Sequence, residues 1–449
     1  MRRTVFGRNK LQPFTIKIDT TKSGVTNAIQ LPIIGSTLVV WGDGTSTNGI
    51  DSVSHTYSTG GVYTIKIYGS FTKIYFNNSG DRLKILEILS MGDYYLGNDW
   101  SGSFYGCANL TAVAGKWDKI TNGSLMFADC NALTSLPNAT FANLTSGNSM
   151  FNLTSISTLP KATFSSLTVA DTMFRYCYAL TSIPSANFSN VASGTAMFQN
   201  CAVLTNLPTA TFGNITNGNF MFQGCSNLPG LSSATFANLT TGTSMFQSCV
   251  KLVTLSSATF LSLSTAASMF SGCSLFTGLS NITFANLVTG SSMFLSCVKL
   301  TDLSSATFAN LTTGTSMFQS CSLLASLPNA IFANLTNGSL MFADSKMGSL
   351  PNATFDKLTN GSTMFNACEI KTFNSAVTFS KLTNGGLMFR FSTLTTARYS
   401  QLLNDIRTYN TNSSVTLHGG NSKYDSSASS ARSYLVSTKL WSITDGGLI

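Results

Sequence analysis

Charge is scarce in this sequence: Asp, Glu, Lys and Arg together make up 10% of its 449 residues, against about 25% in an average soluble domain. Histidine occurs only twice, at His55 and His418. The ten cysteines include no Cys-x-x-Cys pair, which argues against a zinc site. Acid–base chemistry therefore has few side chains to use, and we expect no enzyme, no catalytic residue, no bound metal and no cofactor.

A basic face is also missing, although the net charge is +9. Between residues 176 and 342 the charged residues are Lys251, Lys299 and Asp302. A groove that follows nucleic-acid phosphates needs many cations on one surface, so nucleic-acid binding is excluded for most of the chain. The densest positive cluster lies in the N-terminal arm, residues 1–13, and consists of Arg2, Arg3, Arg8 and Lys10. We expect this arm to dock against a partner.

Long apolar runs are absent too. No stretch approaches the roughly 20 residues that span a bilayer, so we expect no membrane insertion. The start, Met1-Arg-Arg-Thr-Val-Phe-Gly-Arg8, has no apolar segment of the kind found in secretion signals. We therefore expect the chain to be assembled in the cytoplasm of the cell that produces it.

An internal repeat dominates what is present. The element Met-Phe-x-x-Cys recurs thirteen times at intervals of 23 or 24 residues, with Ser103 in place of Met in the first copy. Its phenylalanines are Phe104, Phe127, Phe151, Phe174, Phe198, Phe222, Phe246, Phe270, Phe294, Phe318, Phe342, Phe365 and Phe389. All ten cysteines stand three residues later: Cys107, Cys130, Cys177, Cys201, Cys225, Cys249, Cys273, Cys297, Cys321 and Cys368. Thr154, Ser345 and Ser392 take the remaining places.

This periodicity predicts a solenoid, because one such coil cannot bury its own apolar face but stacked coils share a continuous core. Asparagine and glycine recur in register as well, and we expect the glycines, such as Gly123 and Gly242, to mark turns. Equivalent cysteines in adjacent coils point in parallel, which suits disulfide geometry poorly. We therefore expect them to be free, buried thiols that act as small apolar groups.

The pattern Phe-x-x-Cys-x-x-Leu-Thr-x-Leu-Pro, as in residues 127–137, resembles the repeats of BspA-like leucine-rich-repeat surface proteins over residues 103–394. The resemblance implies a right-handed, mainly β solenoid of about 13 coils, with short strands and single helical turns. It also implies a role in adhesion.

A second module is expected at residues 14–72. Residues 14–19 and 63–68 alternate apolar and polar side chains and predict strands with one buried face. Between and beside them lie Trp41, Asp43, His55, Tyr57 and Tyr63. This set is similar to the polycystic-kidney-disease (PKD) type of immunoglobulin-like β-sandwich. A single carboxylate is too little for calcium, and we interpret His55 as structural.

The flanking segments are expected to cap the repeats. Residues 73–102 read as an imperfect capping repeat. Residues 395–449 predict a small α/β cap: a helix from the spacing of Tyr399, Leu402 and Ile406, a strand at 415–418, a helix near 426–438 and a strand at 441–444. The C-terminal segment resembles modules attached to such repeats in Bacteroidetes and their phages.

Several functions remain open. Asp344, Asp356 and Glu369 occur in successive late coils, so a polysaccharide-active solenoid enzyme is a minor alternative, although solvated surface acids explain them better. A Thr-rich ice- or crystal-binding solenoid is a weaker one. Our first hypothesis is a virion protein of a tailed phage, present in multiple copies. Its arm and sandwich would bind other virion proteins, and its repeats would project to a protein or glycan of the host surface. The main alternative is an exported bacterial cell-surface adhesin.

Overall fold

The computed structural model describes residues 11–24, 26–93, 96–115, 117–207, 210–231, 234–255, 258–279 and 282–449. Arg2, Arg3, Arg8 and Lys10 lie outside the described residues. The described chain is mainly β, with two α-helices and a long series of repeated units joined by small sheets. It divides into two compact units, Met1–Thr211 and Phe212–Ile449, and the division falls within the repeats.

The N-terminal module is built on a six-stranded sheet with the order β4-β3-β6-β1-β7-β8. The strands are β1 (Phe14–Asp19), β3 (Ile33–Val40), β4 (Ser46–Ile50), β6 (Val62–Ile74), β7 (Ile85–Ser90) and β8 (Ala112–Val113). A second, two-stranded sheet joins β2 (Ala28–Leu31) to β5 (Val53–Thr56). Short 3₁₀ turns, η1 (Thr20–Lys22) and η2 (Gly80–Lys84), connect strands of this module.

The alternation in residues 14–19 and 63–68 predicts strands correctly. β1 and β6 pair antiparallel with Ile16 opposite Ile65, and both side chains are buried. The predicted boundary after residue 72 differs from the structure, because β6 continues to Ile74. β7 lies in the segment expected to form a capping repeat, yet it pairs with β1 as well as with β8 of the first coil. The sheet of the module therefore runs directly into the repeats.

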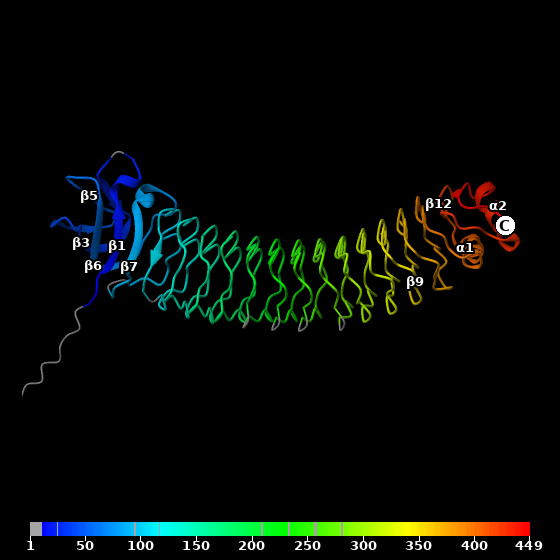
Figure 1. Ribbon diagram of the computed structural model, residues 1–449, viewed down its shortest axis with the longest axis horizontal. Helices are drawn as coiled ribbons and strands as arrows, with labels where there is room; N and C mark the ends of the chain where they lie inside the picture. The colour runs from blue at the N-terminus through cyan, green and yellow to red at the C-terminus, as the bar shows by residue number, and fades with distance from the viewer. Residues whose placement is uncertain are drawn as a thin grey trace, which may run out of the picture. The chain divides into compact units, whose positions relative to one another are not determined.

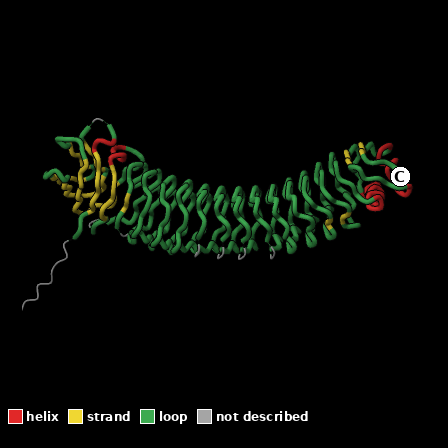
Figure 2. Tube along the Cα trace, in the orientation of Figure 1, coloured by secondary structure: helices red, strands yellow, loops and turns green. Residues whose placement is uncertain are grey.

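Within each unit, successive coils lie side by side (Figures 1 and 2) and are joined by single parallel bridges. Thr241, Thr265 and Thr289 form one such series. Four alternate backbone N–H groups of one coil, at residues 242, 244, 246 and 248, donate to carbonyls of the next coil at 2.8 Å. The coils are thus held by backbone hydrogen bonds even though few residues qualify as strand.

Phenylalanine fills the interior in two stacked columns. In the second unit the rings of Phe246, Phe270 and Phe294 stack at centroid distances of 5.5 and 5.4 Å. A second column meets the first edge-on, as where Phe308 lies 5.7 Å from Phe318 at 73°. Both arrangements are the preferred geometries of aromatic pairs, worth about 0.5–1.5 kcal/mol each beyond area burial. The sequence-predicted apolar columns are therefore the core of the repeats.

The backbone of the Met-Phe-x-x-Cys element adopts a conformation that the sequence did not indicate. In most coils the residue before Met and the residue before Cys have left-handed φ, for example +53° at Ser244 and +61° at Ser248. Each coil therefore contains successive tight turns, with Cys249 N–H donating to Phe246 O at 3.0 Å. Because of these left-handed residues, every second backbone N–H of the element points toward the next coil and donates to it.

The recurrent glycines were expected to mark turns, but the structure shows that they allow close packing between coils. Gly242 and Gly123 do not have left-handed φ, so they are not there for turn geometry. A Cβ on Gly123 would lie 3.0 Å from Met150 Cε and 3.1 Å from Leu144 Cδ1. Close packing against the methionine of the following coil therefore limits this position to Gly or, as at Ala170 and Ala266, to Ala.

All ten cysteines are free and buried, as the sequence predicts. Their thiols also make a contact that the sequence did not indicate: Cys273 Sγ donates to Phe246 O of the preceding coil at 3.0 Å, and Cys297 Sγ donates to Phe270 O at 3.0 Å. In the last coil, Ser392 Oγ donates to Phe365 O at 2.6 Å. Thr154 and Ser345 instead donate to Phe151 O and Phe342 O of their own coil, at 2.9 and 2.6 Å. The position therefore holds a small side chain whose donor finds a phenylalanine carbonyl, in the same or the preceding coil.

The C-terminal cap matches its predicted order. It contains α1 (Thr396–Tyr409), β12 (Thr416–His418), η3 (Ser426–Ala428), α2 (Ser429–Ser437) and β13 (Ser442–Thr444). β12 pairs in parallel with β11 (Asn384–Gly385) of the last coil. A two-stranded sheet of β9 (Ser349–Leu350) and β10 (Thr372–Phe373) lies among the late coils. Neither α-helix of the described segments has the length and apolar character needed to cross a membrane.

Cys273→Ser tests the buried thiol column. Burial raises the pKa of Cys273 from 9.0 to about 12, so above pH 9 the unfolded chain releases a proton that the folded chain keeps. The thiol's contribution is therefore fully present below pH 9, and it falls by about 1.4 kcal/mol per pH unit between pH 9 and 12. Serine keeps the hydrogen bond and removes the titration.

We expect denaturant unfolding at pH 8, 9, 10 and 11 to show a wild-type free energy that falls more steeply above pH 9 than that of the variant. Parallel curves for the two proteins would mean that the thiol is not buried in this way.

Candidate binding surface

The motif residues of the N-terminal module form one cluster. The rings of Trp41 and His55 stack at 4.9 Å, His55 meets Tyr57 edge-on at 4.5 Å, and Tyr57 stacks on Tyr63 at 3.7 Å. Tyr57 donates its hydroxyl to Trp41 O at 2.9 Å. The structure therefore brings together Trp41, Asp43, His55, Tyr57 and Tyr63, the residues that the sequence singled out.

Asp43 ties the loop after β3 to β5. Its Oδ1 accepts from Thr45 N–H and from the Thr45 hydroxyl, and its Oδ2 lies 2.8 Å from His55 Nε2. The hydrogen bonds from Thr45 and the neighbouring His55 lower the pKa of Asp43 to about 2. Across the described residues, no group of three or more His, Cys, Asp and Glu side chains is arranged to hold a metal. The carboxylate of Asp43 thus has a structural purpose in the described contacts.

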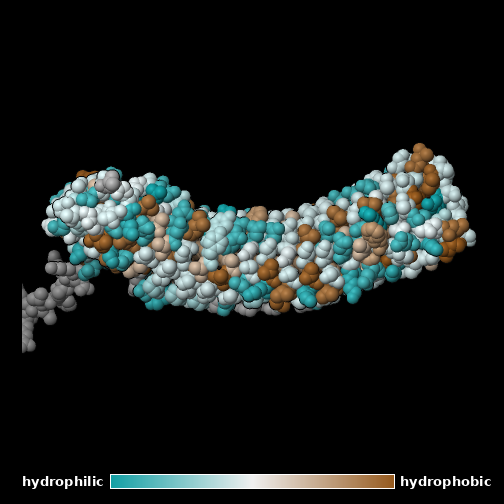
Figure 3. All heavy atoms as spheres, turned by 45° about the horizontal axis from the view of Figure 1, so that its top comes forward, coloured by the Kyte–Doolittle hydropathy of each residue, from teal (hydrophilic) through white to brown (hydrophobic). Residues whose placement is uncertain are grey.

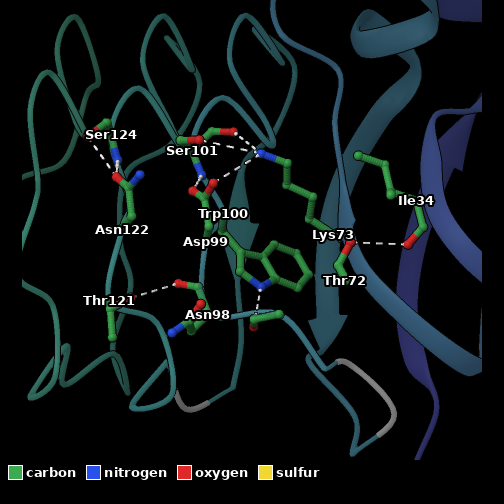
Figure 4. A network of polar contacts seen from close by, with 11 residues as sticks. Ile34, Thr72, Lys73, Asn98, Asp99, Trp100, Ser101, Thr121, Asn122 and Ser124 are labelled. Carbon is green, nitrogen blue, oxygen red and sulfur yellow. Dashed lines mark hydrogen bonds and ion pairs between the residues drawn. The ribbon is translucent and has the colours of Figure 1, made fainter.

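A polar network joins the module to the first coil (Figure 4). Lys73 of β6 donates to Ser101 O at 3.3 Å, and its Nζ lies 3.7 Å from Asp99 Oδ2. The side chain of Trp100 is fully buried and donates to Gly97 O at 3.2 Å. Together with the β7–β8 pairing, these contacts fix the first coil to the sheet.

Threonine and asparagine on the coils use their donors within the protein. Thr336 Oγ1 donates to Thr312 O of the preceding coil at 3.0 Å, and Thr312 Oγ1 donates to Val288 O at 3.1 Å. Asn310 Nδ2 donates to Ala285 O at 2.8 Å, and other asparagines of this row do the same. Along these rows each threonine hydroxyl proton and one of the two N–H groups of each asparagine amide are therefore used within the protein.

The remaining candidate residues, three acids and a histidine, belong to the late coils and the C-terminal cap rather than to the N-terminal cluster. Asp344, Asp356 and Glu369 are all exposed, which suits solvated surface acids. His418 lies in β12, where its Nδ1 accepts from Gly420 N–H at 3.1 Å. Burial and the nearby Arg390 lower the pKa of His418. His55 and His418 therefore each have a local structural contact.

Sequence reasoning missed the exposed aromatic residues of the coils. Tyr178 is 58% exposed and Phe391 is 66% exposed. Tyr176 and Phe391 each stand directly before the cysteine position, with φ of +61°. Both have an arginine over the ring, Arg175 at 4.5 Å and Arg390 at 4.4 Å. A large side chain at a position that is mostly Gly, Ser, Asn or Asp in other coils is the signal that could have identified Tyr176 and Phe391.

Asp43→Asn tests the contribution of the charged carboxylate. Because the pKa of Asp43 is lowered from 3.8 to about 2 in the folded protein, its stabilising contribution is present above pH 4 and is lost as pH falls through 2. We expect the variant to melt at a lower temperature than the wild type at pH 6, and at the same temperature near pH 2. A difference in melting temperature that stays constant with pH would contradict this account.

Comparison with known proteins gives a family for the repeats. The family described as "Mycoplasma protein of unknown function, DUF285" matches residues 98–211, 149–258 and 216–333. No curated protein matches the chain. Among solved structures, the chain is similar to "Plant peptide hormone receptor RGFR1 in complex with RGF2", at 13% identity over 79% of this chain and 74% of that chain. The TM-score of 0.21 is too low to indicate a common fold.

The three matched segments overlap and together cover residues 98–333, more than half of the 449 residues. The chain therefore belongs to the DUF285 family of Mycoplasma-type repeats, which are related to the repeats of BspA-like surface proteins.

Proposed function

We propose that this chain is a non-catalytic structural and adhesive protein whose repeats form a right-handed, leucine-rich-repeat-like solenoid of about 13 coils. The observation that carries the proposal is the register shared by successive coils. The same N–H groups donate to the next coil at 2.8–2.9 Å along much of each unit, and the same rings stack at 5.3–5.9 Å. Such a scaffold holds equivalent side chains at a regular spacing, which suits a binding surface.

The surface chemistry favours an uncharged ligand. Weakly polar residues cover most of the visible face of the coils, with apolar residues scattered among them (Figure 3). The hydroxyls of the threonine rows, and one N–H of each amide in the asparagine row, donate to carbonyls of the preceding coil. A protein or glycan of a cell surface fits this description better than a phosphate polymer, which requires a cationic surface.

The N-terminal part is proposed as the attachment end. We interpret residues 14–72, extended by β7, as a PKD-type immunoglobulin-like module, on the strength of the cluster around Trp41, Asp43 and His55. The cations Arg2, Arg3, Arg8 and Lys10 precede this module and supply charge for docking to a partner. The β7–β8 pairing and the Lys73 contacts would carry load from the module to the coils.

Two settings follow for such a protein. The first is the virion of a tailed phage, where the N-terminal part binds other virion proteins and many copies project toward the host. The second is an adhesin on the outside of a bacterial cell, which the relation of the family to BspA-like surface repeats favours. In both settings the repeats face the exterior.

The test of the proposed function is whether the chain is displayed on the exterior of a virus particle or of a bacterial cell. We expect antibodies raised against the full chain to label the exterior of purified particles or of intact producing cells in immunogold electron microscopy, with mass spectrometry identifying the chain in the labelled fraction. A chain lacking residues 1–13 is expected to fold with unchanged circular dichroism but to be lost from that fraction. Detection only in the cell interior would contradict the proposed function.

A further inference from the structure

Two neighbouring coils of the first unit place large side chains where the backbone is left-handed. Leu153 has a φ of +60° and Tyr176 a φ of +61°, directly before the cysteine position. The same place is occupied by Gly106, Gly224 and Gly272, and by serine at residues 248, 296 and 320. A left-handed conformation is unfavourable for most residues other than glycine, asparagine and aspartate.

Leu153 is 39% exposed and Tyr178, two residues after Tyr176, is 58% exposed, whereas Tyr176 itself is half-buried. The left-handed conformation is common to this position, since Asp129, Ala367 and Phe391 have it too, so it does not by itself mark a function. What distinguishes this place is that both residues flanking the cysteine, Tyr176 and Tyr178, are aromatic, which occurs in no other repeat of the sequence.

The two tyrosine rings are held in a defined arrangement. Their centroids are 5.9 Å apart and their planes are tilted by 37°. Arg175 places its guanidinium carbon 4.5 Å from the centre of the Tyr176 ring, and its Nη2 donates to the Tyr176 hydroxyl at 2.9 Å. Arg175 therefore positions Tyr176, and the rings need little ordering when a ligand arrives.

Register aligns the neighbours of these rings. Leu153 N–H donates to Arg175 O at 3.0 Å, and Tyr176 N–H donates to Gln199 O at 2.9 Å. Leu153, Tyr176 and Asn200 consequently form one row over three consecutive coils, with Tyr178 beside it. The row begins with an aliphatic group, continues with an aromatic ring and ends with an amide.

We propose that Tyr176 and Tyr178 form a stacking platform for one sugar ring of a neutral oligosaccharide, bordered by Leu153 and by the amide of Asn200. The inference rests on the proposed adhesive function and assigns its ligand class. The electron-rich faces of aromatic rings attract the C–H groups on the flat side of a pyranose, and the amide can bond to a ring hydroxyl. The three large side chains Leu153, Tyr176 and Tyr178 are far fewer than the roughly 20–30 residues that a stable protein interface uses.

Isothermal titration calorimetry of the full chain with soluble neutral hexasaccharides of glucose, xylose, mannose and N-acetylglucosamine tests this site. We expect at least one to bind, and Tyr178→Ala to weaken that binding at least tenfold. Tyr176→Gly is expected to weaken it similarly while the melting temperature stays the same or rises, because glycine already occupies this position at Gly224 and Gly272. A structural role for Tyr176 would instead lower the melting temperature.

Phe391→Ala is the matched control, since Phe391 also has a left-handed φ and an arginine, Arg390, over its ring, but Thr393 stands where the site has Tyr178, so there is no pair of rings. We expect it to bind sugar as the wild type does. The site is refuted if none of the hexasaccharides binds, or if the tyrosine variants bind as tightly as Phe391→Ala. Surface labelling that persists in the absence of sugar binding would refute this site and leave the adhesive function standing.

Discussion

The hydrogen bonds between coils are the interaction on which the rest of the structure depends. A single coil has too few residues to enclose its own phenylalanines, and its alternate N–H groups find their acceptors only in the next coil. Left-handed residues such as Ser244 and Ser248 turn these donors in one direction. The fixed register places equivalent residues of neighbouring coils against each other, so the ring of Phe246 stacks on that of Phe270. It also brings the thiol of Cys273 within hydrogen-bond distance of Phe246 O.

The same register limits what the surface can do. Threonine and asparagine rows donate to carbonyls of the preceding coil, and the surface of the repeats carries little charge. Recognition then depends on side chains that depart from the consensus of the repeat. Tyr176 and Tyr178 depart from it most clearly, because two aromatic rings flank one cysteine: Tyr178 is exposed, and Tyr176 is half-buried beneath the guanidinium of Arg175.

The repeat in the sequence predicts what repeats in the structure: the phenylalanine columns and the buried thiols of Cys249 and its equivalents. The spacing of apolar residues after the repeats predicts the order of α1, β12, α2 and β13 in the cap. The Trp41–His55–Tyr57 cluster also follows from its motif. Backbone handedness was not predictable, because serine and leucine give no sign of a left-handed φ. The place of β7 in the sheet, the packing reason for Gly123 and the bonds of the thiols were missed, since each depends on a neighbour distant in sequence.

Deletion of one whole period tests the central claim most directly. Removing residues 240–263 joins Leu239 to Ser264, whose hydroxyl makes the same bond to a preceding carbonyl as that of Thr240, so the register is restored. We expect this protein to keep its circular dichroism and a cooperative thermal transition. Removing only residues 240–251 breaks the register, and we expect that protein to lose the cooperative transition. Equal tolerance of both deletions would contradict the account.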